Sequence, residues 1–350
     1  MATITDVCRV AGVSKATVSR VLNNTGQVKE STREIVIQAI QALDYRPNTL
    51  AQALANQRSD TIGLIISDFA GGYFGRLLRQ ATRSADEAGM QLIVTDGHED
   101  AERERKAIDM LVHRRCDAIV LYSRCMGDAQ LTQLTRELPV PLIVLNRYLP
   151  EAAERSVVFE QSGAARMATE HLIALGHQRI ACITPKLASR TGQLRLQGYK
   201  DALNAHGIAL DEDLISAGAF SPSTGYEACS KLLQTGKSFT ALLCCSDMMA
   251  EGAYRALAER GLKIPEDVSV FGFDNDPATA YMIPALSTVK LPISEMTRQA
   301  IQQAVKLSNG LPVSPIPPFI GQLILRESVA SASGQVSQEK LAPPTEIEDD

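Results

Sequence analysis

One stretch decides the fold at the amino-terminal end of the chain: Ala11-Gly12-Val13-Ser14-Lys15-Ala16-Thr17-Val18-Ser19-Arg20-Val21-Leu22. Gly12 can adopt the left-handed turn that ends one short helix, and Ser14 can cap the helix that follows. Four apolar residues of the stretch can then face a small core: Val13, Val18, Val21 and Leu22. Their spacing leaves an outward face that consists of Lys15, Ala16, Ser19 and Arg20. The stretch predicts a tight turn followed by a short amphipathic helix, about residues 15–22.

Two further short helices are expected on either side of this stretch. Thr3 can cap a helix from Ile4 to Ala11, with Asp6 placed where a carboxylate stabilises a helix N-terminus. A third helix, about residues 30–43, carries apolar residues at helical spacing: Val36, Ala39, Ile40 and Leu43. The sequence therefore predicts a small all-α domain of three helices in residues 1–45.

The charge of the chain is unevenly distributed. Residues 1–59 contain seven Lys or Arg and four Asp or Glu, so this end carries +3 although the whole chain carries −5. A basic end on an acidic body indicates a polyanionic partner at that end only. The outward face has the layout of a helix-turn-helix recognition helix, in which Lys15 or Arg20 can read guanine in the major groove and the Ala16 methyl can meet thymine. Five further residues are predicted DNA contacts, to phosphate: Ser14, Thr17, Ser19, Asn23 and Thr32. The alternative is a solvated amphipathic helix.

Residues 46–59 are expected to form a linker. Pro47 cannot continue a helix and biases Arg46 toward an extended backbone. The helix-prone segment Thr49–Ala55 is shorter than the roughly 12–15 residues that an isolated helix needs to persist in water, so it should fold only against a partner.

Residues 60–328 alternate between β-rich runs and helical stretches. The expected strands include Ile62–Ile66, Leu92–Val94, Ala118–Leu121 and Leu142–Leu145, separated by helices near 74–88, 101–114 and 128–137. Continuous apolar strands separated by helices indicate a parallel sheet covered on both faces. The pattern recurs with helices at 162–175, 190–206, 223–234 and 248–260 and strands at 180–183, 241–245 and 268–271. Two similar doubly wound α/β lobes, with a ligand cleft at the carboxyl ends of their strands, are therefore predicted. Residues 329–350 are expected to be a disordered tail.

In these motifs the sequence resembles the lac and galactose repressor family of bacterial transcriptional regulators. The matching segments run in unbroken order from about residue 2 to 328: Thr3–Val7, Ala11–Ser14, Thr17–Asn23, Tyr45–Asn48, Leu50–Leu54, Gly176–Ile180, Leu194–Tyr199, Asp247–Ala250 and Gly272–Asp274. The resemblance implies a helix-turn-helix head on a periplasmic-binding-protein-like body, a homodimer, and a small-molecule effector that acts allosterically. It also implies that paired hinge helices fold on the operator, where Leu54 wedges into the minor groove and bends the duplex. The hinge residues predicted on this ground to bind DNA are Asn48, Ala51 and Leu54.

The predicted effector site lies in the cleft. Adjacent hydroxyls of a sugar are best bound by side chains that form two hydrogen bonds at once. The guanidinium of Arg195 can donate such a pair, and the carboxylate of Asp274 can accept one. By resemblance both fall on effector-binding positions, as do Phe220, an aromatic platform, and Asn146. Asp68 and Phe74, after the first strand, can line the other lobe, with Tyr73 beside them. Ser246 is included, although many relatives have asparagine there; Asn275 likewise replaces a common aspartate. The alternative role for Arg195 and Asp274 is a buried pair that stabilises the lobe.

The sequence thus predicts a sequence-specific transcriptional repressor of a sugar utilisation operon, released from a pseudo-palindromic operator by a hexose or a β-glucoside. The segments Arg115–Ile119 and Gly198–Leu203 resemble most those of the galactose and β-glucoside regulators. The alternatives are a regulator with a purine or other corepressor, and a sugar-binding transport protein. An enzyme is not expected, because no Walker, G-x-S-x-G, H-E-x-x-H or G-x-G-x-x-G motif occurs. No cofactor or metal is expected. The start of the chain lacks a signal-peptide pattern and its seven cysteines fit reduced thiols, so a cytoplasmic location away from membranes is expected.

Overall fold

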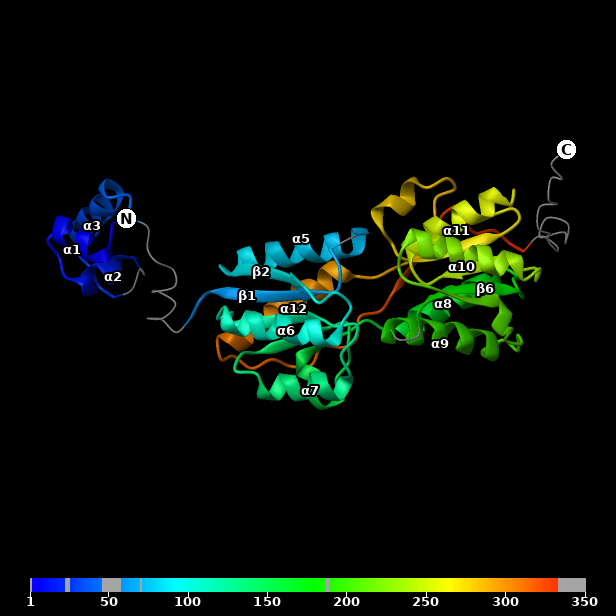
Figure 1. The fold of residues 1–350 in the computed structure, drawn as a ribbon, viewed down its shortest axis with the longest axis horizontal. Helices are drawn as coiled ribbons and strands as arrows, with labels where there is room; N and C mark the ends of the chain where they lie inside the picture. The colour runs from blue at the N-terminus through cyan, green and yellow to red at the C-terminus, as the bar shows by residue number, and fades with distance from the viewer. Residues whose placement is uncertain (1, 23–25, 46–57, 70, 187–188, 333–350) are drawn as a thin grey trace, which may run out of the picture. The chain divides into compact units, whose positions relative to one another are not determined.

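The computed structural model describes residues 2–22, 26–45, 58–69, 71–186 and 189–332. The chain divides into two compact units, residues 1–60 and residues 61–350, which are described separately (Figure 1). Four of the predicted DNA-binding residues lie outside the described ranges: Asn23, Asn48, Ala51 and Leu54. Nearly all of the predicted hinge and residues 333–350 of the predicted tail lie outside them too.

The first unit contains α1 (Ile4–Ala11), α2 (Lys15–Leu22) and α3 (Glu30–Ala42). Thr3 and Asp6 form a reciprocal capping box at the start of α1, and Gly12 ends that helix at φ 65°. The hydroxyl of Ser14 accepts a hydrogen bond from the Thr17 amide at 3.2 Å. The core of this unit consists of Val7, Ala11, Val18, Val21, Val36 and Ala39, with Val13, Leu22, Ile40 and Leu43 packed against it. These helices, their caps and their core match the sequence-based expectation.

The first lobe of the second unit is built on a parallel sheet in the order β2-β1-β3-β4-β5. Its strands are β1 (Thr61–Ile66), β2 (Gln91–Asp96), β3 (Ala118–Tyr122), β4 (Leu142–Leu145) and β5 (Ser156–Val157). Its helices from this part of the chain are α5 (Gly71–Glu87), α6 (Ala101–His113), α7 (Asp128–Glu137) and the short η1 (Pro150–Arg155). Every residue of β1 is buried: Leu64 packs into the core on the α5 side and Ile65 into the core on the α6 side. Burial on both faces explains the continuous apolar run.

The second lobe is built on a sheet in the order β11-β10-β9-β8-β6-β7, parallel except for the antiparallel β11. Its strands are β6 (Ile180–Pro185), β7 (Ile215–Gly218), β8 (Ala241–Cys244), β9 (Ser269–Asp274), β10 (Ser287–Lys290) and β11 (Gln322–Ile324). Its helices are α8 (Gln161–Ala174), α9 (Arg190–Ala205), α10 (Pro222–Gln234) and α11 (Asp247–Glu259), with the short η2 (Glu212–Leu214) and η3 (Pro277–Tyr281). The elements that the sequence predicted agree with these bounds to within three residues at either end.

The two lobes are not two successive segments of the chain. After β10 the chain forms α12 (Ile293–Ser308), which packs against α5, β3 and β4 of the first lobe (Figure 1). The chain then returns, and Phe319 pairs with Phe159 on the way to β11. Three segments therefore connect the lobes, near residues 158–160, 291–292 and 309–321.

The body also extends slightly past residue 328, where its end was predicted. Ala330 donates a hydrogen bond to the Ser269 hydroxyl at 3.0 Å, and the Ala332 amide donates to Leu175. Residues 329–332 are thus held by the second lobe because their backbone groups find partners there, and the predicted tail begins too early.

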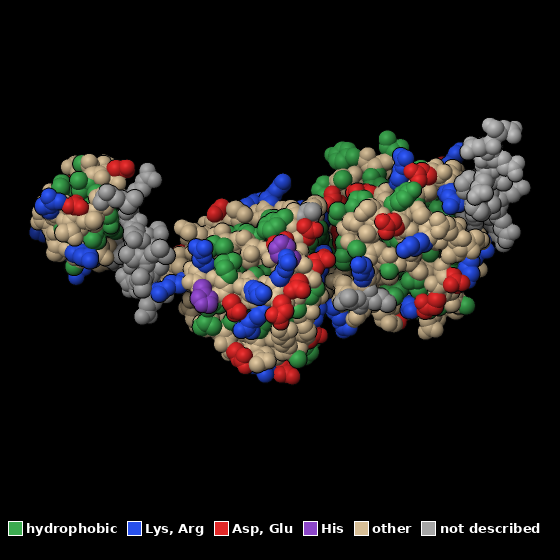
Figure 2. All heavy atoms as spheres, viewed as in Figure 1, with side chains coloured by type: hydrophobic (Ala, Val, Ile, Leu, Met, Phe, Trp, Pro, Cys, Tyr) green, Lys and Arg blue, Asp and Glu red, His purple; other side chains and the backbone are tan. Residues whose placement is uncertain are grey.

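The surface of the body carries charges of both signs, interspersed over the face that Figure 2 shows. Among the described residues, no helix combines the length and the apolar character that a membrane crossing requires. All seven cysteines are free thiols, and five of them are buried.

Candidate functional site

The outward face of α2 is presented as the sequence predicted. Ser14, Lys15, Ala16 and Arg20 are exposed, and Thr17 and Ser19 are half-buried. On the opposite face, Val18 and Val21 are buried in the core of the three helices. Thr32, the other predicted contact in the described ranges, is half-buried near the start of α3. The first unit therefore fixes α2 by one face and leaves two cations on the other.

The cleft residues of the body gather where the strand order of each sheet reverses. In the first lobe this point lies between β1 and β3, and in the second lobe between β6 and β8. Ligands of open parallel sheets bind outside the carboxyl ends of the strands at such points. Asn146 follows β4 and Asp274 ends β9, so both lie at carboxyl ends.

Arg195 is at the centre of a buried network. Its side chain is 3% exposed, and the guanidinium lies 3.6 Å from the centroid of the Phe273 ring. Its Nε donates to Gln161 Oε1 at 2.8 Å, one terminal nitrogen donates to the Cys245 carbonyl at 2.5 Å, and the other pairs with Asp274 Oδ1 at 3.3 Å. The guanidinium is therefore fixed in a single orientation, with Asp274 at the edge of the network.

Gln161 extends this network to the other lobe. Its amide nitrogen donates to Asn146 Oδ1 at 2.8 Å. Asn146, in the left-handed region at φ 65°, donates in turn to the Tyr122 hydroxyl at 2.9 Å and to Thr191 Oγ1 at 3.4 Å. Three predicted site residues, Asn146, Arg195 and Asp274, thus belong to one connected set.

Asp274 lies under opposing electrostatic influences. Burial raises the pKa of its carboxyl group, whereas the cations Arg195, Arg76 and Arg124 act to lower it. Asp247 lies behind it, and burial together with the Asp274 charge raises the pKa of Asp247 as well. Asp247 accepts hydrogen bonds from Thr288 Oγ1 and from the amide of Asp276, each at 2.7 Å, so it holds the loop after β9.

Aromatic side chains from both lobes meet at Arg124. The guanidinium carbon of Arg124 lies 4.5 Å from the centroid of the Phe220 ring in the second lobe. In the first lobe the same carbon lies 5.3 Å from Phe74 and 6.0 Å from Tyr122. Glu99 pairs with Arg124, and the Arg124 side chain is 13% exposed. The platform that the sequence predicted at Phe220 is therefore covered by a cation.

Tyr73 places a buried polar atom in the same region. Its hydroxyl is buried and makes no hydrogen bond of normal length and angle with the described residues, although the Tyr122 hydroxyl lies close enough to act on it. Burial, followed by the neighbouring Tyr122, raises the pKa of this hydroxyl, and Asp274 adds to the effect. Each unmade hydrogen bond of a buried hydroxyl costs roughly 1–3 kcal/mol, so a ligand that pairs with Tyr73 would gain from it.

Other predicted residues have different surroundings. Ser246 is 1% exposed, and its hydroxyl caps α11 by accepting from the Met249 amide at 3.2 Å. Phe74 is 3% exposed and belongs mainly to the core. Asp68 is exposed on the loop after β1.

Sequence reasoning missed Gln161, Tyr122, Arg124 and Arg76. Arg76 of α5 donates to the carbonyls of Asp274 and Asn275 and so links the lobes. Tyr122 and Arg124 lie at the carboxyl end of β3, the strand beside the reversal point. Their position at the end of this strand is the sequence signal that could have identified Tyr122 and Arg124 as site residues.

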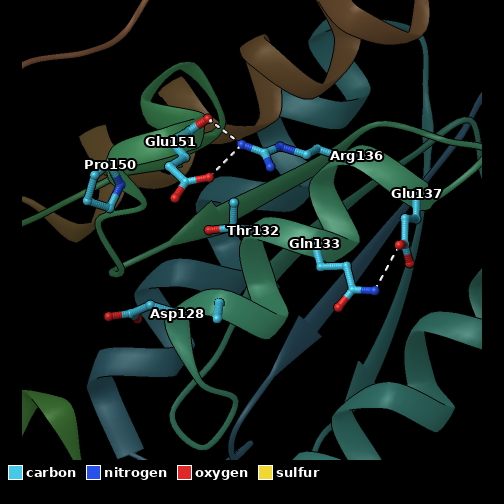
Figure 3. Close-up of a pocket in the computed structure, with 8 residues that line it drawn as sticks. Asp128, Thr132, Gln133, Arg136, Glu137, Pro150 and Glu151 are labelled. Atoms are coloured by element: carbon cyan, nitrogen blue, oxygen red, sulfur yellow. Dashed lines mark hydrogen bonds and ion pairs between the residues drawn. The ribbon is translucent and has the colours of Figure 1, made fainter.

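Two further cavities do not have the character of this cleft. One of about 430 Å³ lies between α7 and η1, and in Figure 3 the side chains of Arg136 and Glu151 point toward each other. Arg136 pairs there with Glu151 at 2.8 Å, and Gln133 donates to Glu137 at 2.8 Å. Another, of about 680 Å³, lies at the amino-terminal edge of the second sheet, where Lys237 pairs with Asp211. In the described residues no group of His, Cys, Asp and Glu is arranged to hold a metal ion.

Comparison with known proteins agrees with both units. Residues 3–48 match the model of the lacI family of bacterial regulatory proteins, and residues 169–329 match that of a periplasmic binding protein-like domain. The HTH-type transcriptional regulator AscG of Escherichia coli (strain K12) is 43% identical over 335 residues, which cover 95% of this chain and 100% of that protein.

Solved structures agree as well. The lac repressor dimer bound to operator and the anti-inducer ONPF is 30% identical, with a TM-score of 0.86 over 94% of this chain and 99% of that one. A sugar-binding transcriptional regulator of the lacI family from Escherichia coli, complexed with phosphate, is 41% identical, with a TM-score of 0.72 over 79% of this chain and 100% of that one. The family resemblance and the fold class inferred from the sequence are thereby confirmed. The chain belongs to the lacI family of bacterial regulatory proteins and is a helix-turn-helix transcriptional regulator.

Proposed function

We propose that this chain is a dimeric repressor that binds a pseudo-palindromic operator through its helix-turn-helix head and is released by a sugar, a hexose or a β-glucoside. The observation that carries the proposal is the network around Arg195, because it joins hydroxyl-binding groups of both lobes in one cleft. The protein would act in the cytoplasm, where its DNA target lies, and as a regulator rather than an enzyme.

The DNA step depends on α2. Its exposed Lys15 and Arg20 can donate to guanine O6 and N7, and the exposed Ala16 methyl can contact thymine. Ser14, Thr17, Ser19 and Thr32 can position the head on phosphates, which carries little sequence information. Asn23 belongs to the same proposed set, and Asn48, Ala51 and Leu54 would act from the hinge, with Leu54 as the minor-groove wedge.

The effector step depends on groups that are already in place. Arg195 and Asp274 would serve adjacent hydroxyls of a sugar, one as donor and one as acceptor. Asn146 and the unpartnered hydroxyl of Tyr73 would contact it from the first lobe. Phe220 would pack against the apolar part of the sugar, beside the guanidinium of Arg124, which would bind the ligand itself. Phe74, Asp68 and Ser246 remain proposed contacts of the surrounding wall.

A homodimer is supported by an exposed apolar surface on the second lobe. Tyr281, at the end of η3, is 85% exposed, and Ile283, two residues later, is 94% exposed. Large apolar side chains that are close in the sequence and both exposed to solvent are typical of an interaction surface. Two heads related by a two-fold axis would then read two half-sites.

Coupling between the sites follows from the way the cleft is closed. Arg76 holds the two lobes together at the end of β9, and a sugar in the cleft would add contacts to both lobes. An effector changes operator affinity only as far as it binds the two lobe arrangements differently. We propose that the closed arrangement disfavours the paired hinge, so that the sugar is an inducer.

The test starts with an operator selected by the purified protein from a random DNA library. Fluorescence anisotropy of the labelled operator, at fixed salt, is then followed during titration with galactose, glucose, cellobiose, ribose and hypoxanthine. Release by a hexose or by cellobiose is expected. Tightening by hypoxanthine would reverse the sign and the class of the effector, and failure to select any operator would contradict the repressor function itself.

A further inference from the structure

A small cavity at the mouth of the cleft has a different chemical character from the network inside. It has a volume of about 180 Å³ and lies between the lobes. The residues that give it its character are Glu99 and Arg124 from the first lobe and Lys186, Ser189 and Phe220 from the second. Two cations and one anion therefore line a space at the edge of the proposed sugar site.

The two cations differ in how firmly they are held. Arg124 is fixed by three aromatic rings and by Glu99, so its guanidinium has little freedom to leave the cavity. Lys186 is exposed, and no ion pair of its ammonium group occurs in the part of the chain that the structure describes. One fixed and one adjustable cation thus face the same space.

Ser189 adds a neutral polar group without a partner. Its hydroxyl oxygen is buried and makes no hydrogen bond within the described ranges. Ser189 is also the N-cap residue of the sixteen-residue helix α9, yet its side chain does not cap the helix. The hydroxyl is therefore available to a ligand beside the positive end of a helix dipole.

The cavity shares two residues with the proposed sugar site, Arg124 and Phe220. Arg124 contributes to the field at the Asp274 carboxylate, and Phe220 belongs both to the cavity wall and to the proposed sugar platform. A ligand whose ring lies on Phe220 could therefore place a substituent between Arg124 and Lys186.

We propose that this cavity binds a phosphate group carried by the sugar, so that the effector is a phosphorylated sugar rather than a neutral one. The inference rests on the proposed function, because it names the chemistry of the ligand of that same cleft. A phosphate dianion would accept charge-assisted hydrogen bonds from Arg124 and Lys186 and one from Ser189. Glu99 opposes this binding, because its carboxylate already accepts from the Arg124 guanidinium and repels the phosphate.

Calorimetric titration of the full-length protein at constant ionic strength tests the inference. The ligands are pairs that differ only by phosphate: glucose and glucose 6-phosphate, galactose and galactose 6-phosphate, cellobiose and its 6′-phosphate. At least one phosphorylated member should bind about tenfold more tightly than its neutral partner, because one charge-assisted hydrogen bond contributes about that factor. Equal affinities within every pair would overturn the inference.

Two variants locate the effect. Lys186→Gln should remove most of the preference for the phosphorylated sugar and leave the affinity for the neutral sugar unchanged. Glu99→Gln should increase the preference several-fold, because the anion that competes for Arg124 is lost. Lys263→Gln removes another exposed cation of the second lobe, one that lines none of the described cavities, and it should change neither affinity. Identical behaviour of Lys186→Gln and Lys263→Gln would contradict the assignment.

Inorganic phosphate distinguishes the source of the anion. We expect it to bind far more weakly than the phosphorylated sugar, because it lacks the sugar ring that would pack on Phe220 and bind Arg195. Binding of inorganic phosphate as tight as that of the sugar phosphate would show a site for the free ion and overturn the inference. If neutral sugars alone bind and release the operator, the inference fails and the proposed function stands. If no sugar of either kind binds, the proposed function fails as well.

Discussion

Arg76, on the first lobe, donates a hydrogen bond of 2.8 Å to the backbone carbonyl of Asp274, on the second lobe. The same guanidinium donates to the neighbouring carbonyl of Asn275 at 2.9 Å. A cation on α5 thus holds the end of β9, the strand that presents the Asp274 carboxylate to the cleft. Arg76 is therefore one of the side chains that hold the two lobes together, and it acts directly on the strand end that carries the proposed effector-binding carboxylate.

Arg76→Ala should therefore weaken effector binding. Loss of two hydrogen bonds from a charged donor favours the open cleft, and the ligand must then close it, so we expect its affinity to fall about tenfold. Titration calorimetry with the inducing sugar measures this. Arg79→Ala, which removes an exposed arginine from the same helix, is the matched control and should bind the sugar normally. Unchanged affinity in Arg76→Ala would show that the link between the lobes has no role in binding.

Arg195→Ala should give a repressor that no sugar releases. The substitution removes the guanidinium that donates to both Gln161 and Asp274, while the helix-turn-helix head is unchanged. We expect operator affinity within about threefold of the unchanged protein and no release at any sugar concentration, measured by anisotropy. Arg195→Lys, which keeps the charge but loses the planar fork, should also fail. Normal release by either variant would exclude Arg195 as a ligand contact, and the thermal midpoint of each variant reports whether the lobe still folds.

Lys15→Ala should weaken operator binding and spare sugar binding. Lys15 is exposed at the start of α2, where a recognition helix contacts bases, and one such contact is worth about 1–3 kcal/mol. Arg9→Ala removes a cation of similar exposure from α1 and should have a smaller effect. Anisotropy at several salt concentrations separates the roles: a base contact changes sequence preference, and a phosphate contact changes the salt slope. Equal losses in the two variants would count against α2 as the reading helix.

The local structure of this chain follows from short-range patterns. The capping box of Thr3 and Asp6 lies within one helical turn, and the turn at Gly12 needs only the glycine's freedom at φ 65°. The continuous apolar run of β1 predicts a strand with both faces buried, as the packing of Leu64 and Ile65 into different cores shows. Patterns of this kind give the elements and their order.

The site could be predicted only in part, because its contacts are long-range. Asp274 and Asn146 were found by position at strand ends and by family resemblance, and Arg195, within α9, by its side-chain chemistry and the same resemblance. Gln161, which joins Arg195 to Asn146, is the first residue of α8 and has no local signal. The return of α12 to the first lobe could not be predicted for the same reason. The pattern of an amphipathic helix shows which of its faces is buried but not which sheet that face packs against. The sequence shows that Arg124 carries a charge, but only the fold shows that its guanidinium lies over the ring of Phe220.

Tyr281→Asp should separate the dimer. A carboxylate placed at a residue that is 85% exposed costs the folded monomer little, but it would be desolvated in an apolar interface. Sedimentation velocity should show a monomer, and operator affinity should fall at least about tenfold because two half-sites are no longer read together. Leu311→Asp, at a leucine that is 54% exposed after α12, is the control and should remain dimeric. A dimeric Tyr281→Asp would place the interface elsewhere.

His177 should make the stability of the second lobe depend on pH. Its side chain is buried; Nδ1 lies 2.9 Å from Thr240 Oγ1 and Nε2 lies 3.0 Å from the Ala330 carbonyl. Burial lowers the pKa of this imidazole below its usual value, and the hydrogen bond to Ala330 opposes the shift only partly. The unfolded chain therefore binds a proton more readily than the folded chain, so stability is present above about pH 6.5 and is lost as the pH falls below it.

Scanning calorimetry at about pH 7.5 and about pH 5.5 checks this expectation. The unfolding midpoint of the second unit should fall on acidification by several degrees more in the unchanged protein than in His177→Gln, which cannot bind the proton. His206→Gln, at an exposed histidine that ends α9, should behave like the unchanged protein. If the decrease is the same in all three proteins, the acid sensitivity of the lobe arises from groups other than His177, and residues 329–332 are held to the body without a contribution from its titration.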